Sequence, residues 1–197
     1  MKDLLQLPLN LPRPTDDGAC SHLPGRRLPS VALPSTAGGS VDLSAESGRV
    51  VVFAYPRTGR QGQPSLVPDW DLIPGARGCT PQSCGFRDLS REFERAGCRV
   101  FGLSTQTTEY QRELVERLQL PFPILSDAEL RLSVALALPT HSIANLTLLK
   151  RLAWVSRDGV LEHVFYPVFP PDRNATEVLA WISEHPQHVK PTGISLG

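Results

Sequence analysis

Two cysteines that lie close together carry the most informative chemistry in this sequence. Cys79 and Cys84 are separated by four residues, within the segment GCTPQSCG that spans residues 78–85. Ionised thiols act as nucleophiles, as metal ligands or as partners in a disulfide. The chain has 4 cysteines among 197 residues, too few for a scaffold held together by disulfides. The close pair therefore indicates redox chemistry or metal binding rather than a structural role.

Cys79 is predicted to lie where a helix begins. Residues 81–96 are expected to form this helix, because apolar residues recur on one face and Gly97 ends the pattern. Pro81 fits a first helical turn, where its missing N–H costs nothing. The unpaired N–H groups and the dipole at a helix N-terminus favour a thiolate, and the charge of Arg77 acts in the same direction. The sequence therefore predicts a nucleophilic sulfur at Cys79.

The spacing of the two cysteines predicts a disulfide that forms and breaks. Five positions apart on a regular helix, their Cα atoms are separated by roughly 8–9 Å. A disulfide tolerates a Cα–Cα distance of at most about 6.8 Å. Cys79 and Cys84 can therefore bond only if the first turn unwinds. Gly78 and Gly85 flank the segment and lower the cost of that change.

A metal site is a poor explanation of the cysteines. The pair lacks the spacing of zinc ligands, and none of the 5 histidines is suitably placed in the sequence. We therefore expect no metal at this pair. Cys98 opens a predicted strand and is expected to be a buried structural thiol. Cys20 is expected to be incidental, although an exposed thiol there could serve as an alternative disulfide partner.

Strands and helices alternate along the rest of the chain. The apolar run at residues 50–55 is typical of a central strand that is buried on both faces. The other elements are expected at residues 99–104 (strand), 108–118 (helix), 123–125 (strand), 128–137 (helix), 152–155 with 162–166 (hairpin) and 174–182 (helix). Thr108 with Gln111 is expected to form a capping box, and Asp127 to cap the next helix. This order predicts an α/β fold with a central, partly antiparallel sheet flanked by helices.

Proline and glycine divide the chain into regions. Prolines recur from the start, so residues 1–30 are expected to form an extended arm, followed by one domain over residues 31–197. A long loop rich in proline and glycine separates the strand at 50–55 from the helix that carries the cysteines. A loop of this length in a compact domain usually has a functional reason.

Charge and hydropathy exclude several classes of partner. The chain has 20 basic and 20 acidic residues, so neither nucleic acid nor an anionic membrane is an expected partner. No apolar run approaches the ~18 residues that a membrane span requires. The first residues do not read as a signal peptide. We therefore expect a cytoplasmic protein.

The residues around the cysteines resemble a known family. The strand at 50–55, the segment GCTPQSCGFRD at 78–88 and the segment PFPILSD at 121–127 occur in the order seen in peroxiredoxins of the Q type. These proteins, also called bacterioferritin comigratory proteins, belong to the AhpC/TSA superfamily. The resemblance covers about residues 31–185. It implies a thioredoxin-like fold and a thiol peroxidase activity without a cofactor.

The resemblance also implies roles for individual residues. Cys79 would attack a hydroperoxide and become a sulfenic acid, and Cys84 would condense with it to form a disulfide. A thioredoxin-like or glutaredoxin-like reductant would then reduce that disulfide. An arginine from a later strand holds the thiolate in this family. Arg151 is the best matching position, with Lys150 as the alternative. The protein is expected to be a monomer or a weak dimer.

One departure from the family pattern concerns the residues before Cys79. The family has a proline seven residues before its peroxidatic cysteine and a threonine or serine three residues before it, where this chain has Leu72 and Ala76. If residues 59–74 are an insertion, Pro56 and Thr58 take these two roles. We therefore expect Thr58 to return to the site of Cys79 across the inserted loop.

Two other functions stay open at this point. A thiol–disulfide oxidoreductase of thioredoxin type uses a similar fold, but it normally has two residues between its cysteines. A redox-sensing module would pass its oxidation state to a partner without turning over peroxide.

Overall fold

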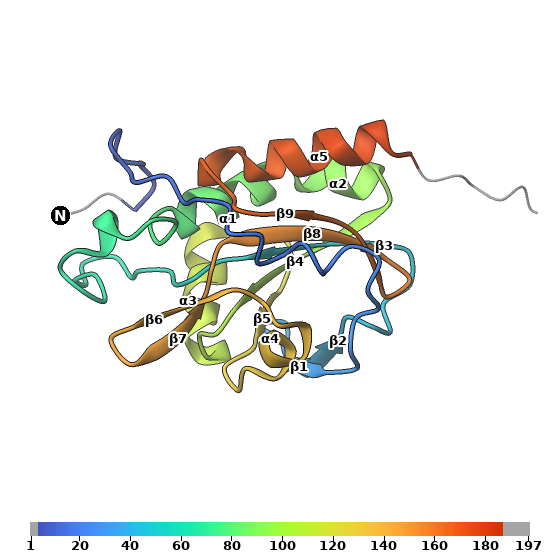
Figure 1. Cartoon of the computed structure of the whole chain (residues 1–197), viewed down its shortest axis with the longest axis horizontal. Coiled ribbons are helices and arrows are strands. Elements are labelled where there is room, and N and C mark those ends of the chain that lie inside the picture. Colours follow the sequence, from blue (N-terminus) through green and yellow to red (C-terminus); the bar gives the residue numbers. More distant parts are fainter. Residues whose placement is uncertain (1–3, 187–197) are drawn as a thin grey trace, which may run out of the picture.

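A mixed sheet of five strands forms the centre of the computed structural model, which describes residues 4–186 (Figure 1). In spatial order the strands are β5 (Ile124–Ser126), β4 (Cys98–Ser104), β3 (Arg49–Ala54), β8 (Leu152–Arg157) and β9 (Val160–Phe165). β3, β4 and β5 run parallel, whereas β8 is antiparallel to both β3 and β9. The predicted α/β fold with a mixed central sheet is confirmed.

Helices and short hairpins surround this sheet. The helices are α1 (Cys79–Asp88), α2 (Ser90–Arg95), α3 (Thr108–Leu118), α4 (Arg131–Leu136) and α5 (Asn174–Glu184), with short 3-10 turns η1 (Trp70–Leu72) and η2 (Pro171–Arg173). The hairpins pair β1 (Ala32–Pro34) with β2 (Ser40–Asp42) and β6 (Thr140–Ile143) with β7 (Leu146–Leu149). Neither of these hairpins was predicted from the sequence.

Two apolar cores lie on opposite faces of the sheet, because successive side chains of a strand point to opposite sides. On one face Phe53 stacks on Phe86 of α1, with ring centroids 4.3 Å apart, and α2, α3 and α5 complete this core. On the other face Trp154 of β8 packs with residues of α4 and of the N-terminal segment. Figure 1 shows α1, α2 and α5 above the sheet and α4 below it. β3, which contributes to both cores, is buried at all of its positions.

The helix that follows β3 differs from the prediction in one respect. A single helix was expected over residues 81–96, but Leu89, with φ −102° and ψ 13°, interrupts it between α1 and α2. The predicted cap of α3 is also wrong by one residue. Thr107, rather than Thr108, has the extended backbone of a cap, and its side chain accepts a hydrogen bond from the backbone N–H of Tyr110.

The N-terminal segment runs along the domain and contributes to its core. Cys20, Leu23 and Leu28 are buried with the second face of the sheet. Arg27 forms an isolated bridge with Val160 of β9. The division of the chain into an arm of residues 1–30 and a domain of residues 31–197 stays a prediction, and residues 1–3 and 187–197 lie outside the described part.

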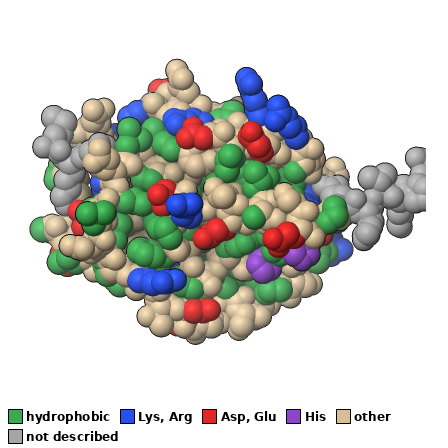
Figure 2. Space-filling view, turned by 90° about the horizontal axis from the view of Figure 1, so that it is seen from above, with side chains coloured by type: hydrophobic (Ala, Val, Ile, Leu, Met, Phe, Trp, Pro, Cys, Tyr) green, Lys and Arg blue, Asp and Glu red, His purple; other side chains and the backbone are tan. Residues whose placement is uncertain are grey.

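Acidic and basic side chains are interspersed on the face shown in Figure 2, in keeping with their equal numbers. Within residues 4–186 no helix has both the length and the apolar character that a membrane crossing requires.

Candidate active site

The fold places Cys79 at the first position of α1. The preceding residue, Gly78, has φ 104°, a left-handed conformation that an L side chain rarely adopts. A Cβ at this position would also lie 2.3 Å from Cγ of Pro171 and 3.0 Å from Cδ2 of Leu7. Only glycine therefore allows the chain to turn into α1 while these two segments pack against it. Cys79 thus lies at a helix N-terminus, as the sequence predicted.

A buried guanidinium contacts the sulfur of Cys79. Arg151 lies one residue before β8 and donates from Nη2 to Sγ of Cys79 at 3.2 Å. The same nitrogen donates to the carbonyl oxygens of Gly75, Ala76 and Arg77 at 3.1–3.2 Å. A cation this close stabilises a thiolate relative to a thiol. The main-chain bonds fix the guanidinium next to the sulfur.

The alternative candidate for this contact points elsewhere. Nζ of Lys150 pairs with Asp17 at 2.7 Å, and Tyr166 donates to the same carboxylate at 2.8 Å. Hydrogen bonds from Lys150 and Tyr166 lower the pKa of Asp17 to about 2. Lys150 therefore ties the N-terminal segment to the domain, and Arg151 alone of the two reaches Cys79.

The side-chain amide of Gln82 is a further hydrogen-bond partner of Arg151. Gln82 accepts a hydrogen bond from Nη1 of Arg151, and its Nε2 donates to Asn174 Oδ1 at 2.8 Å. Both amide side chains are fully buried. Gln82 thus links the cation to the first residue of α5.

Thr58 lies in the same site, after the end of β3. It is buried, its N–H donates to Oε1 of Gln106 at 2.9 Å, and its Oγ1 lies 3.1 Å from the same oxygen. Thr58 and Cys79 line one cavity, whereas the residues that occupy the family positions, Leu72 and Ala76, are absent from its lining.

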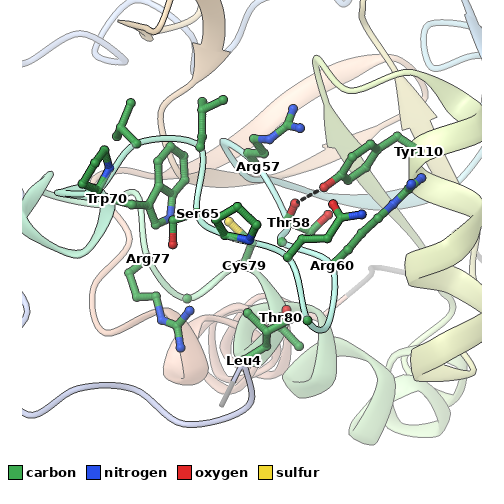
Figure 3. Close-up of a pocket in the computed structure, with 18 residues that line it drawn as sticks. Leu4, Arg57, Thr58, Arg60, Ser65, Trp70, Arg77, Cys79, Thr80 and Tyr110 are labelled. Carbon is green, nitrogen blue, oxygen red and sulfur yellow. Dashed lines mark hydrogen bonds between the residues drawn. The ribbon is translucent and has the colours of Figure 1, made fainter. Parts of the chain in front are cut away.

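The cavity in front of Cys79 has a volume of about 750 Å³ (Figure 3). The loop of residues 59–74 supplies much of its lining, including Leu66, Val67 and Trp70. Cys79 itself is only 4% exposed, but it lines this cavity, so its sulfur faces space that a small molecule can enter. Arg57, Tyr110 and other polar residues line the part of the cavity near Thr58.

Cys84 lies on the same helix as Cys79, and both thiols are free. Cys84 is half-buried, and burial raises the pKa of its thiol above the ordinary value. Since both residues belong to α1, a disulfide between them requires the first turn to unwind.

The other two cysteines are buried away from the cavity. Desolvation raises the pKa of Cys20 to about 12 and that of Cys98 to about 11. Both thiols are therefore neutral and weakly nucleophilic near pH 7. No group of three or more His, Cys, Asp or Glu side chains in the described part of the chain is arranged to hold a metal ion.

Several residues of the site were not predicted from the sequence. Gln82 and Asn174 are 92 positions apart, and Gln106 follows Thr58 by 48 positions. No local pattern signals such pairings. Gln82 lies within the segment that carries the family resemblance. The only indication of its role in the sequence was that it is a polar residue on the inner side of α1.

The sequence and the fold both match known proteins. The family model described as Redoxin matches residues 23–179. Peroxiredoxin Bcp of Escherichia coli (strain K12) is 31% identical over 166 residues, which cover 82% of this chain and 96% of the relative. The chloroplastic peroxiredoxin Q of Oryza sativa subsp. japonica is 31% identical over 157 residues, covering 79% of this chain but only 64% of the relative.

Among solved structures, peroxidoxin BcpB from Mycobacterium tuberculosis has a TM-score of 0.68 at 26% identity, covering 84% of this chain and 100% of that one. A peroxiredoxin Q from Xanthomonas campestris has a TM-score of 0.63 at 20% identity, covering 90% and 96%. The central sheet, its helices and the Redoxin match thus define a protein of the thioredoxin-like redoxin class. Within that class the chain belongs to the peroxiredoxin family, PrxQ/Bcp type, as its resemblance implied.

Proposed function

We propose that this chain is a thiol peroxidase in which Cys79 is the peroxidatic and Cys84 the resolving residue. The observation that carries the proposal is the 3.2 Å contact between Arg151 Nη2 and Cys79 Sγ at the lining of an open cavity. A guanidinium in this position stabilises the thiolate, which is the nucleophilic form of cysteine. Family membership supports the same activity.

In the first half-reaction the Cys79 thiolate attacks the distal oxygen of a hydroperoxide. An S–O bond forms as the O–O bond breaks, so the sulfur is oxidised to a sulfenic acid and the peroxide is reduced. The departing alkoxide or hydroxide takes up a proton and leaves as alcohol or water. The charge moves from sulfur to the departing oxygen, and Arg151 lies within reach of the sulfur end.

Thr58 is proposed to hold the peroxide. Its hydroxyl and Gln106 Oε1 are 3.1 Å apart, and an amide oxygen can only accept, so the hydroxyl proton points toward Gln106. The lone pairs of Thr58 Oγ1 are then available to accept a hydrogen bond from the O–H of the substrate.

In the second half-reaction the Cys84 thiol attacks the sulfenic sulfur of Cys79. An S–S bond forms, the S–O bond breaks and water leaves. A dithiol donor of the thioredoxin or glutaredoxin type then reduces the disulfide by thiol–disulfide exchange and is itself oxidised. Burial raises the pKa of the Cys84 thiol in the intact helix, so exposure of Cys84 on unwinding would favour its reactive thiolate.

Consumption of hydrogen peroxide with thioredoxin, its reductase and NADPH tests the proposal. The unaltered chain is expected to turn over repeatedly, and Cys79→Ser to consume none. Cys84→Ser is expected to complete one turnover and to leave a sulfenic acid that reacts with dimedone. Cys98→Ser, which alters a thiol far from the cavity, serves as the matched control and keeps its turnover.

Two outcomes would contradict the assignment. Faster reaction of the reduced chain with a disulfide substrate than with peroxide favours a thiol–disulfide oxidoreductase. Oxidation that stops after one equivalent, with donor present, favours a redox-sensing module. The cytoplasmic location and the monomeric or weakly dimeric state stay predictions, which cell fractionation and sedimentation test.

A further inference from the structure

We propose that the N-terminal segment, residues 4–15, holds the start of α1 in the conformation that presents Cys79 to peroxide, and that its release controls the rate at which the disulfide with Cys84 forms. This inference rests on the proposed peroxidase function and adds a control of its second half-reaction. It is carried by contacts between the segment and the two residues that precede Cys79, and by leucines of the segment that divide into half-buried and exposed positions.

The N-terminal segment contacts both residues that lead into α1. Nη2 of Arg77 donates to the carbonyl oxygen of Gln6 at 3.2 Å. Cδ2 of Leu7 lies 3.0 Å from the position that a Cβ of Gly78 would occupy. Figure 1 shows the segment, drawn in blue, beside the start of α1. The segment precedes residue 23, where the match to the Redoxin family model begins, so these contacts come from outside the matched part of the chain.

The leucines of this segment form two groups that differ in burial. Leu4, Leu7 and Leu11 are half-buried, whereas Leu5 and Leu9 are exposed, Leu9 completely. Leu4 lines the cavity at the N-terminus of α1. The half-buried leucines remove apolar surface from water, which stabilises the segment on the domain.

The other end of the segment is fixed separately. The guanidinium carbon of Arg13 lies 5.9 Å from the centroid of the Phe169 ring. Asp17, just after the segment, pairs with Lys150 and accepts a hydrogen bond from Tyr166. The segment can therefore stay attached at this end while its first part releases the start of α1.

The residues that the segment contacts also position the cation beside Cys79. The carbonyl oxygen of Arg77 accepts from Nη2 of Arg151 at 3.1 Å, while the side chain of Arg77 donates to the segment. Gly78 is the N-cap residue of α1, and its φ of 104° sets the direction in which the helix begins. The segment therefore contacts the two residues that bring the sulfur and the guanidinium together.

Formation of the proposed disulfide would break this arrangement. The first turn of α1 must unwind before the two sulfurs can meet. Contacts that exist only in the wound conformation favour it over the unwound one, and they are lost when the turn opens. Release of Gln6 and Leu7 is thus part of the barrier to the disulfide, and weaker contacts should lower that barrier.

Two leucines of the segment provide a matched pair of variants. Leu7→Ala truncates the side chain beside Gly78, whereas Leu9→Ala makes the same change at a fully exposed position. The reduced chain is mixed with one equivalent of hydrogen peroxide and quenched at increasing times. Mass spectrometry then separates the sulfenic acid, which has gained an oxygen atom, from the disulfide, which has lost two hydrogen atoms. We expect the sulfenic acid to convert to the disulfide about fivefold faster in Leu7→Ala, because truncation of a half-buried leucine removes part of its packing energy. Leu9→Ala should match the unaltered chain.

Hydrogen exchange of the reduced chain gives a second readout that requires no peroxide. The backbone N–H of Gln82 donates to the carbonyl oxygen of Gly78 at 3.0 Å, so its exchange reports on unwinding of the first turn. This exchange should also become about fivefold faster in Leu7→Ala and stay unchanged in the control variant. The N–H of Phe93 in α2, which is also hydrogen-bonded, is the internal control, because its exchange shows whether the fold as a whole has been loosened.

The outcomes separate this inference from the proposed function. If the disulfide forms at the same rate in Leu7→Ala and in the unaltered chain, the inference is overturned and the peroxidase assignment stands, even if exchange at Gln82 rises. If Leu9→Ala accelerates the reaction as much as Leu7→Ala does, the contact is not the cause and the inference is also overturned. If Cys79 is oxidised but no disulfide with Cys84 forms in any of the three proteins, the proposed resolving role fails. If Cys79 is not oxidised at all, the peroxidase proposal fails.

Discussion

Gln82 connects Arg151 to Asn174: its side chain accepts from the guanidinium and donates to the amide oxygen at the start of α5. Gln82 is also the third residue after Cys79, on the turn that must unwind if the proposed disulfide forms. The residue that binds the cation therefore lies in the segment that the proposed disulfide would unwind.

Replacement of this amide should slow the attack on peroxide. Gln82→Leu keeps the volume but removes both hydrogen bonds, so the guanidinium loses one of its fixed acceptors. A hydrogen bond to a charged group contributes about 1.5–3 kcal/mol, which corresponds to a decrease of kcat/KM by about tenfold or more. The expected decrease is measured with hydrogen peroxide.

A purely structural role of Gln82 predicts a different result. If it orients Arg151, the rate at which iodoacetamide alkylates Cys79 should fall in Gln82→Leu, because the guanidinium is held less firmly beside the sulfur. A lower denaturation midpoint with an unchanged alkylation rate would show that Gln82 only stabilises the fold.

The hydroxyl of Thr58 should matter more than its methyl group. Thr58→Val is nearly isosteric but cannot accept a hydrogen bond from the substrate, so kcat/KM for hydrogen peroxide should fall by about tenfold. Thr58→Ser keeps the hydroxyl and should retain most of the rate. Equal losses in both variants would exclude the proposed contact with peroxide.

Gly78 should tolerate no side chain. Gly78→Ala combines a left-handed backbone, which costs about 1–2 kcal/mol for an L residue, with the overlap on Pro171. Gly38→Ala is the matched control, since Gly38 has φ 95° and no atom within 4 Å of a built Cβ. Urea denaturation should show the larger loss for Gly78→Ala, and equal losses would mean that the packing around α1 adapts.

The buried thiol of Cys98 predicts a change of stability at alkaline pH. Burial raises its pKa from 9.0 to about 11 in the folded chain. Above pH 9.0 the unfolded chain loses this proton while the folded chain keeps it, so the free energy of unfolding falls between pH 9.0 and about 11. Urea denaturation over this range should show a shallower decline for Cys98→Ala. An identical decline in both proteins would mean that other groups determine the alkaline limit.

The hydrophobic periodicity of the sequence was sufficient to predict most strands of the central sheet. Residues 50–54 of β3 form an unbroken apolar run, and a strand buried on both faces produces that pattern. The hairpin of β6 and β7 was not predicted because its strands are short and its side chains are largely exposed or half-buried, so they show no clear apolar pattern. The break at Leu89 was not predicted because the helical spacing of apolar residues continues across it.

For the site, the sequence and the fold contribute different information. Apolar periodicity and Pro81 indicated that Cys79 lies at a helix start, since a helix start has a local signature. The candidates for a cation beside it came from a family resemblance, and only the tertiary structure distinguishes Arg151, which contacts the sulfur, from Lys150, which pairs with Asp17. Contacts between segments that are distant in the sequence depend on how the chain packs, so local patterns in a single sequence do not predict them.

The carbonyl oxygens of residues 75–77 hold the Arg151 guanidinium in place independently of any bound peroxide. The electrostatic environment is thus preorganised, and little reorientation is needed when charge leaves the sulfur. In the proposed cycle, however, oxidation withdraws Cys79 from that environment. That cycle would dismantle one helical turn and rebuild it in each turnover, and it therefore includes the refolding of this turn as a kinetic step.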